Sequence, residues 1–234
     1  HKMIVNGDDP SGTAYGDDDA TVIVRSAGHG PRGAQAMVMA MFRNDACLGA
    51  IVGDEYAMDG YRRMPEAAAR PGSVEEVAAL VKLCARLRIP VTARGGGTGL
   101  AAACVPAPGG VVMALDRLKR TVDADGANHT ITVQAGMTLH DLYEEVGKMG
   151  LFFPPHPGDE GAYIGGAVAA NAGGARAVKY GTVRRYVIGL QVVLADGRIA
   201  ELGGKFIKSS SGYDLLSLMI GSEGTLGVIT RVTL

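Results

Sequence analysis

Four of the seven residues from Arg94 to Leu100 are glycine, in the order Arg-Gly-Gly-Gly-Thr-Gly-Leu. The stretch follows a short apolar run, residues 89–93, that predicts a strand. Glycine reaches positive φ easily, so successive backbone N–H groups in such a loop can turn toward one point and form a nest for an anion. A tight surface turn is the alternative, but three adjacent glycines there would lose backbone entropy without benefit. The stretch therefore indicates a loop that binds a phosphate or pyrophosphate.

The composition of the chain narrows the classes of partner. Its 234 residues carry a formal net charge of -1, aromatic residues make up 5%, and tryptophan is absent. Binding nucleic acid needs a basic surface or aromatic side chains on which bases stack, so we expect no nucleic acid partner. The hydrophobic content of 47% allows a sizeable core. No apolar run reaches the roughly 18 residues of a membrane span.

The cysteines give a first indication of the cellular compartment. Cys47, Cys84 and Cys104 are odd in number and contain no CxxC pair. Such cysteines are typical of reduced thiols, which predicts a cytoplasmic location. Each is better explained as a small core residue than as a nucleophile.

The first fifty residues differ in character from the rest. Residues 3–33 carry acidic clusters at 8–9 and 17–19. These clusters lack the alternating ligands and closing glutamate of a calcium loop, so they predict a solvated, poorly ordered arm. Residues 34–50 are rich in alanine and methionine and could form a helix. We expect an N-terminal extension over 1–50 and a folded domain over 51–234.

Patterns of caps, apolar spacing and turns predict the elements of the folded part. Ser73 at the N-cap, with Glu76 three residues later, forms a capping box and begins a helix that ends before Pro90. The other expected elements are a strand over 111–115, a hairpin over 120–125 and 130–135, a helix from Thr138 through Met149, a hairpin over 187–195 and 198–202, a short helix over 213–219 and a last strand to Leu234. This order predicts an α+β fold of two small α/β subdomains, with a ligand in the crevice between them.

A second irregular stretch runs from Pro154 to Gly174 and is rich in glycine and alanine. It is too long for a plain connection between elements. Small residues would let its backbone lie flat against a large planar ligand. We therefore expect this stretch to share a site with the glycine loop.

Two common nucleotide-binding motifs do not explain the glycine loop. Residues 97–102 match the G-x-G-x-x-A motif of nicotinamide dinucleotide folds, and Asp116 lies at a tolerable distance, but that motif must open a helix. Pro106, Pro108 and two glycines follow too soon for a full helix. A phosphate-loop NTPase is excluded because no Gly-Lys-Ser/Thr follows the loop.

The glycine loop is one of several motifs that occur in a recognisable order. They are Arg94 to Leu100, Ile164-Gly165-Gly166, Asn171-Ala172-Gly173-Gly174, Lys179-Tyr180-Gly181, Ser211 to Leu215 and Gly221 to Gly227. In this order they resemble the FAD-binding (PCMH-type) domain of the vanillyl-alcohol-oxidase-type flavoproteins. Within that family the chain resembles the branch of the glycolate oxidase FAD subunit and D-lactate dehydrogenase. The resemblance covers residues 51–234.

The resemblance implies which residues bind FAD. The pyrophosphate would lie on the glycine loop, the flavin and ribityl chain along the second stretch, and the adenine at the last strand. The implied set is Arg94, Gly95, Gly96, Gly97, Thr98, Gly99, Leu100, Pro157, Gly158, Gly161, Ala162, Gly165, Gly166, Asn171, Gly173, Gly174, Ala175, Tyr180, Gly181, Glu223, Gly224, Val228 and Ile229. Some relatives bond FAD covalently through a histidine of the first loop. That histidine is missing here and nearby His156 is better explained as a loop residue, so we expect non-covalent FAD.

The resemblance also implies an activity. The family oxidises a 2-hydroxy acid by passing a hydride to the flavin, which then reduces a partner flavoprotein or a quinone. Family members carry the catalytic histidine, the basic substrate-binding residues and the metal ligands in a substrate domain that follows the FAD domain. We therefore expect that domain in a missing region or a separate chain, name no catalytic or metal-binding residue, and expect this chain alone to be inactive. Two alternatives are an electron-transfer or assembly subunit and a scaffold that binds no flavin. The intact glycine loops argue against the scaffold.

Overall fold

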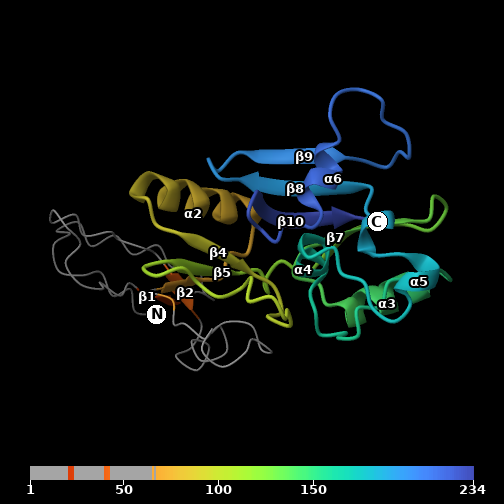
Figure 1. The fold of residues 1–234 in the computed structure, drawn as a ribbon, viewed down its shortest axis with the longest axis horizontal. Coiled ribbons are helices and arrows are strands. Elements are labelled where there is room, and N and C mark those ends of the chain that lie inside the picture. The colour runs from red at the N-terminus through yellow and green to blue at the C-terminus, as the bar shows by residue number, and fades with distance from the viewer. Residues whose placement is uncertain (1–20, 24–39, 43–64, 66) are drawn as a thin grey trace, which may run out of the picture.

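The computed structural model describes residues 21–23, 40–42, 65 and 67–234 (Figure 1). The strands are β1 (Thr21–Ile23), β2 (Ala40–Phe42), β3 (Ala67–Ala69), β4 (Val91–Arg94), β5 (Val111–Ala114), β6 (Thr121–Asp125), β7 (Thr130–Gln134), β8 (Gly189–Leu194), β9 (Ile199–Gly203) and β10 (Gly227–Thr233). The helices are α2 (Val74–Leu87), α3 (Leu139–Lys148), α4 (Ile164–Ala169), α5 (Ala177–Tyr180) and α6 (Leu215–Met219), with a 3-10 turn, η1, at Val183–Arg185. The mixture of helix and sheet confirms the predicted α+β class.

The first subdomain is a three-stranded parallel sheet in the order β3-β5-β4, accompanied by α2. All four residues of the central strand β5 are buried, which explains its continuous apolar sequence. The predicted cap of α2 is confirmed, because Ser73 Oγ accepts the Glu76 N–H at 3.2 Å. The Glu76 carboxylate accepts the Gly72 N–H at 2.7 Å, one residue before the expected partner. The glycine loop leaves this sheet at the end of β4.

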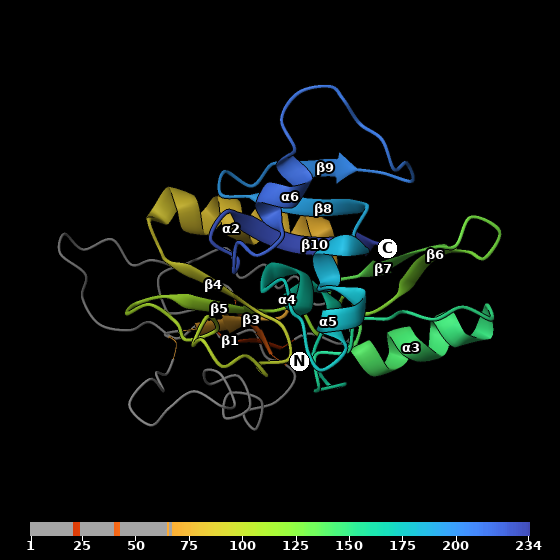
Figure 2. The same cartoon turned by 45° about the vertical axis from the view of Figure 1, so that its right-hand side comes forward.

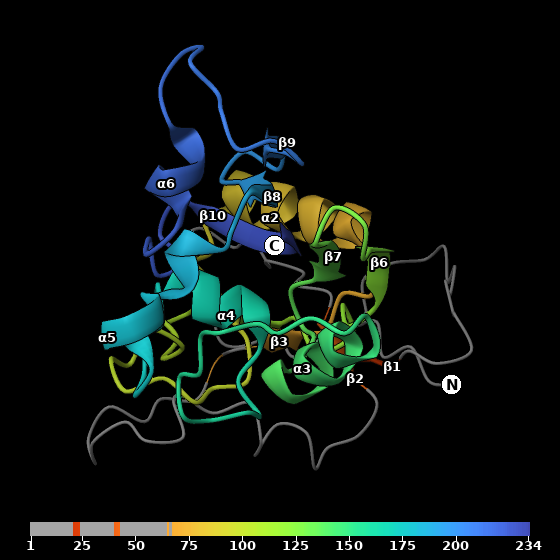
Figure 3. The ribbon, with the colours of Figure 1, turned by 90° about the vertical axis from the view of Figure 1, so that its right-hand side faces the viewer.

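The second subdomain is a five-stranded antiparallel sheet in the order β6-β7-β10-β8-β9. Both predicted hairpins are confirmed, with β6 paired to β7 and β8 paired to β9. Helix α3 begins where predicted, since Thr138 Oγ1 accepts the Asp141 N–H at 3.0 Å. The segment between β9 and α6 projects away from the sheet, as two views show (Figures 1 and 3).

The two subdomains share a core through α2. Val77 and Val81 of α2 and Met113 of β5 are in one buried cluster with Val193 of β8 and Val228 of β10. Helix α4 packs on β10 and lies between the two sheets (Figure 2). This arrangement places the end of β4, the start of α4 and the start of β10 near the junction of the subdomains.

Two segments differ from the secondary structure that the sequence suggested. A strand, β2, lies inside the stretch 34–50, for which a helix was considered, and it pairs with β1. Pairing with β1 and contact with β3 outweigh the helix propensity of alanine and methionine. The rest of the N-terminal prediction falls outside the described residues, and the domain boundary at residue 51 stays a prediction. The stretch 154–174, expected to be irregular, contains the buried helix α4.

Candidate functional site

The glycine loop after β4 packs directly on the second glycine-rich stretch. A Cβ atom added to Gly95 would lie 3.5 Å from Tyr163 Cβ and 3.7 Å from Gly166 Cα. One added to Gly96 would lie 3.0 Å from the Gly161 carbonyl oxygen. A Cβ at Gly95 would thus be in ordinary van der Waals contact, whereas one at Gly96 would be tight against the facing backbone. The structure therefore brings together two stretches that are about seventy residues apart in sequence.

A side chain at Gly97 would meet Arg94 rather than the second glycine-rich stretch. It is buried and has φ +76°, the left-handed region that favours glycine. A Cβ atom there would lie 2.6 Å from Arg94 Cζ and closer still to a terminal guanidinium nitrogen. The Arg94 side chain thus folds back beside the loop that it precedes.

A polar cluster surrounds Tyr163 at the start of α4. Arg70 donates from Nε to Asp116 Oδ1 at 3.1 Å, and a second guanidinium nitrogen pairs with the other carboxylate oxygen. Burial raises the pKa of the Tyr163 hydroxyl, and so does Asp116, while Arg94 and Arg70 oppose the shift. Tyr163 is therefore a neutral hydrogen-bonding group near pH 7. No sequence signal indicated the pairing of Asp116 with Arg70, because the two residues are 46 positions apart.

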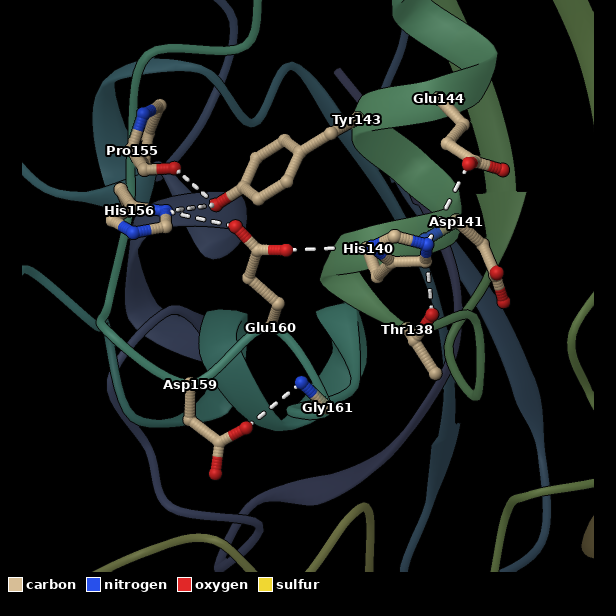
Figure 4. Close-up of polar contacts among 10 residues, drawn as sticks. All are labelled: Thr138, His140, Asp141, Tyr143, Glu144, Pro155, His156, Asp159, Glu160 and Gly161. Atoms are coloured by element: carbon tan, nitrogen blue, oxygen red, sulfur yellow. Dashed lines mark hydrogen bonds and ion pairs between the residues drawn. The ribbon is translucent and has the colours of Figure 1, made fainter.

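The stretch 155–162 is tied to α3 (Figure 4). Two backbone bonds hold it, from the Leu139 N–H to the Ala162 oxygen and from the His140 N–H to the Glu160 oxygen, both at 2.9 Å. The Tyr143 hydroxyl donates to the Pro155 carbonyl at 2.7 Å, which fixes the other end of the stretch. Burial, followed by the charge of Glu160, raises the pKa of Tyr143, so its hydroxyl keeps this donor proton.

The Glu160 carboxylate adds charged contacts between α3 and this stretch. It lies 3.4 Å from His140 Nδ1 and 3.9 Å from His156 Nδ1 (Figure 4). His140 Nε2 also lies 3.5 Å from a Glu144 oxygen. His140, Glu144 and Glu160 are largely exposed and His156 is partly buried, so solvent screens these pairs and the backbone bonds dominate. No three His, Cys, Asp or Glu side chains within the described residues are grouped so that they could hold a metal ion.

Helix α4 owes its position to backbone bonds and small residues. Its first N–H groups are satisfied by the segment that follows β7, since Ile164 donates to Met137 O at 2.9 Å and Gly165 to Ala135 O at 2.8 Å. A Cβ atom on Gly165 would lie 2.6 Å from Ala135 Cβ. Beyond the helix, Gly174 has φ +122° and approaches the His156 carbonyl so closely that no side chain fits. The stretches 155–162 and 171–174 are thereby held side by side.

The loop 221–224 lies against the C-terminal end of α4. The Gly221 N–H donates to Val168 O at 3.1 Å, and the Glu223 N–H donates to Ala169 O at 2.9 Å. Arg184 holds the segment just before this loop, because its Nη1 donates to Ser217 O at 2.8 Å and its other terminal nitrogen donates to Ile220 O. The Arg184 N–H also donates to Asn171 Oδ1 at 3.3 Å. Sequence reasoning missed Arg184, whose role depends on segments that only the fold brings together.

The start of β10 follows this loop. Val228 and Ile229 pair with Val193 and Val192 of β8, whereas the register with β7 begins only at Arg231. On the β7 side, the early residues of β10 therefore have no strand partner within the described sheet. Backbone groups at this edge can face a ligand.

The predicted residues also include positions with local structural roles. Gly181 has φ +83° and ends α5, with the Arg185 side chain against it. The Tyr180 carbonyl accepts the Tyr186 hydroxyl at 2.9 Å, and the Tyr180 ring lies edge-on to Phe152. By contrast Gly99, Leu100, Gly161, Gly166 and Gly224 are exposed, and Leu100 is 78% exposed.

A cavity of about 970 Å³ lies elsewhere. Its walls come from the C-terminal end of α3, the segment after β9, and the end of β10, and they include Met149, Phe152, Phe206 and Tyr213. None of the glycine-loop residues lines it. This cavity is therefore separate from the predicted crevice at the glycine loops. No helix in the described part of the chain is long and apolar enough to cross a membrane.

Comparison with known proteins places the chain in a family. A family model described as FAD binding domain matches residues 65–203, which is more than half of the chain. The chain belongs to the FAD binding domain family. This confirms the resemblance drawn from the motifs, and FAD is the cofactor of the family.

Individual relatives of this FAD binding domain support the predicted branch. The chain is 50% identical over 181 residues to D-lactate dehydrogenase of Anaerostipes hadrus, covering 77% of the chain and 38% of that protein. It is 40% identical over 189 residues to glycolate oxidase subunit GlcD of Bacillus subtilis, covering 80% of the chain and 40% of that protein. The chain thus spans about two fifths of the length of these relatives.

A solved structure supports the fold. Alkyldihydroxyacetonephosphate synthase matches with a TM-score of 0.64 at 24% identity, covering 73% of this chain and 31% of that one. At this identity the match establishes the shared fold alone. The FAD binding domain described here therefore has an α+β architecture that is also found in more distant proteins.

Proposed function

We propose that the chain binds FAD where the glycine loop, the start of α4 and the loop 221–224 meet, as the flavin-carrying part of a 2-hydroxy-acid dehydrogenase. The observation that carries this proposal is the packing of Gly95 and Gly96 on the stretch 161–166. Two glycine-rich backbones from different subdomains meet there, and the surface beside them is lined by exposed small residues. This arrangement suits a long, phosphate-containing ligand with a planar end.

Three segments of the structure have the shape and backbone groups that FAD binding needs. The glycine loop leaves β4 with no helix after it, so its backbone N–H groups can bind a pyrophosphate as a nest. The stretch 157–166, fixed by α3, would lie along the flavin and ribityl chain. The half-open edge of β10 at Val228 and Ile229 would offer its backbone to the adenine.

The proposed chemistry is oxidation at the C–OH carbon of a 2-hydroxy acid. FAD, when bound, supplies a ring system that accepts the hydride from this carbon. The residues of this chain would bind and orient the cofactor, and the Tyr163 hydroxyl would serve as a donor because burial raises its pKa, whereas the Tyr143 hydroxyl holds the stretch 155–162 in place by donating to the Pro155 carbonyl. The names D-lactate dehydrogenase and glycolate oxidase subunit of the relatives support this substrate class. We assign the catalytic base and the substrate-binding groups to no residue of this chain.

Two further parts of the proposal concern partners and location. We propose that a partner flavoprotein or a quinone accepts the electrons, and that a further domain or chain supplies the substrate site. A cytoplasmic location is supported by the reduced thiol of the buried Cys84, which is in no disulfide. Burial also raises the pKa of the Cys84 thiol, so this thiol is unreactive.

Titration with FAD tests the proposal. The purified chain is mixed with excess FAD, separated from free flavin by gel filtration, and precipitated with acid. We expect about one FAD per chain before precipitation and all flavin absorbance in the supernatant afterwards, since the glycine loop supplies no histidine for a covalent bond. Flavin retained in the pellet would contradict non-covalent binding. A chain that passes through the column without flavin would support the scaffold alternative.

A further inference from the structure

Arg94 is a cation without a partner in the described part of the chain. Its Nε is buried and has no hydrogen-bond partner, and none of the ion pairs formed among residues 67–234 involves its guanidinium. An arginine can donate five hydrogen bonds, and a half-buried one loses much of its hydration. Such a group is stable only if it meets an anion or acceptor.

The neighbouring acidic group cannot serve this purpose, because it is already in use. Asp116 pairs through both carboxylate oxygens with Arg70. Arg117 lies in the same region and donates to the Arg70 carbonyl at 3.1 Å, so it adds a further positive charge. The charges of Arg70 and Asp116 cancel, which leaves Arg94 uncompensated beside the neutral Tyr163.

The position of the Arg94 guanidinium relates it to the glycine loop. The Cβ atom that Gly97 lacks would lie 2.6 Å from Arg94 Cζ, so the guanidinium occupies the space beside the middle of the loop. A side chain at 97 would displace the guanidinium from this position. With glycine at 97, the cation and the loop's backbone N–H groups are within one site.

We propose that Arg94 is the residue that neutralises the diphosphate of the bound flavin and so makes the site selective for a diphosphate-bearing cofactor. This inference rests on the proposed function and adds a specificity-determining side chain to it. The planar guanidinium matches two phosphate oxygens at once, which an ammonium group cannot do. The glycine loop contributes uncharged N–H groups, and Arg94 contributes the charge.

The test compares ligands with and without the diphosphate. Dissociation constants of FAD and of riboflavin are measured by flavin fluorescence for the wild-type chain and for Arg94→Gln, Arg94→Lys and Arg86→Gln. Arg86 is an exposed residue in the last turn of α2, so its replacement removes the same charge away from the loop. The salt dependence of FAD binding is recorded for each chain, with circular dichroism to verify folding.

We expect Arg94→Gln to weaken FAD binding about 10- to 100-fold, the usual effect of losing a charged hydrogen bond. Riboflavin binding should not change, and the salt dependence of FAD binding should become shallower because one phosphate contact is lost. Arg94→Lys should fall between Arg94→Gln and wild type, and Arg86→Gln should match wild type. The inference is overturned if Arg94→Gln leaves FAD binding unchanged, or weakens FAD and riboflavin equally.

Inorganic pyrophosphate separates this inference from the proposed function. If the wild-type chain binds no FAD, its thermal unfolding is measured with and without pyrophosphate. Stabilisation of the wild type but not of Arg94→Lys or Arg94→Gln would support Arg94 as a diphosphate contact while the FAD proposal fails. No stabilisation of the wild type would overturn both.

Discussion

Replacing Gly97 with alanine probes the contact between the glycine loop and Arg94. The added methyl group would overlap the guanidinium, whose Cζ would lie 2.6 Å away, and the residue would have to keep φ at +76°. The left-handed conformation costs alanine about 1–2 kcal/mol, and the stiffer unfolded chain offsets about 0.4–1 kcal/mol of this. We expect the backbone effect to lower the free energy of unfolding by about 1 kcal/mol.

The contact with Arg94 adds a separate effect on the cofactor. The guanidinium is the flexible end of a side chain, so it moves away from the methyl group and leaves the site. The affinity for FAD should then fall by about 1.5–3 kcal/mol, or about 10- to 100-fold.

Gly109→Ala is the matched control for this substitution. Gly109 has φ +72°, and a Cβ atom there would meet nothing within 4 Å. It should therefore show the backbone effect on stability without any change in FAD affinity. Urea unfolding and isothermal titration of both variants, and of the double variant Arg94→Gln/Gly97→Ala, measure the two effects. Equal FAD affinities for Gly97→Ala and Gly109→Ala would refute the reasoning, as would fully additive losses in the double variant.

Three further predictions, two of them with a control variant, test other parts of the structure. Gly165→Ala should lower the free energy of unfolding by about 1–3 kcal/mol, because its Cβ would lie 2.6 Å from Ala135 Cβ. Gly166→Ala, where nothing lies within 4 Å, should be neutral or stabilising, and equal urea midpoints for the two variants would contradict this packing. The pKa of Asp125 is lowered from 3.8 to about 2 by the Asn128 side chain, the Asn128 N–H and Lys205, so its charge stabilises the fold above about pH 4 and this contribution is lost as the pH falls toward 2. Asp125→Asn should therefore have a lower urea midpoint than wild type at pH 7 and an equal one near pH 2, and a difference that persists at pH 2 would exclude this origin. Arg184→Met should weaken FAD binding, because it loosens the loop 221–224. The control variant Arg198→Met lies at an exposed turn and should leave FAD binding unchanged. Titration of both variants with FAD compares the two.

Local patterns in the sequence predicted the elements whose stability is local. Ser73 and Thr138 cap their helices because each hydroxyl oxygen reaches an N–H three residues later, a contact within a single turn. The turn at Asp196-Gly197 joins β8 to β9 for the same kind of reason, since Gly197 adopts φ +80°. The glycine loop could be recognised as an anion loop without a following helix, because Pro106 and the glycines after it forbid one. The family motifs then identified FAD as the cofactor.

Tertiary contacts decided the features for which the chain has no local signal. Helix α4 has six residues and no side-chain cap, and it forms because Ala135 O and Met137 O accept its first N–H groups and Ile164 and Val168 are buried. Strand β2 lies where a helix was considered, because it can pair with β1. Arg70 meets Asp116 across 46 residues of sequence, and that pairing determines that Arg94 is left without a carboxylate. Sequence spacing cannot predict that Arg94 stays without a carboxylate, because this depends on which of the neighbouring arginines the fold places against Asp116.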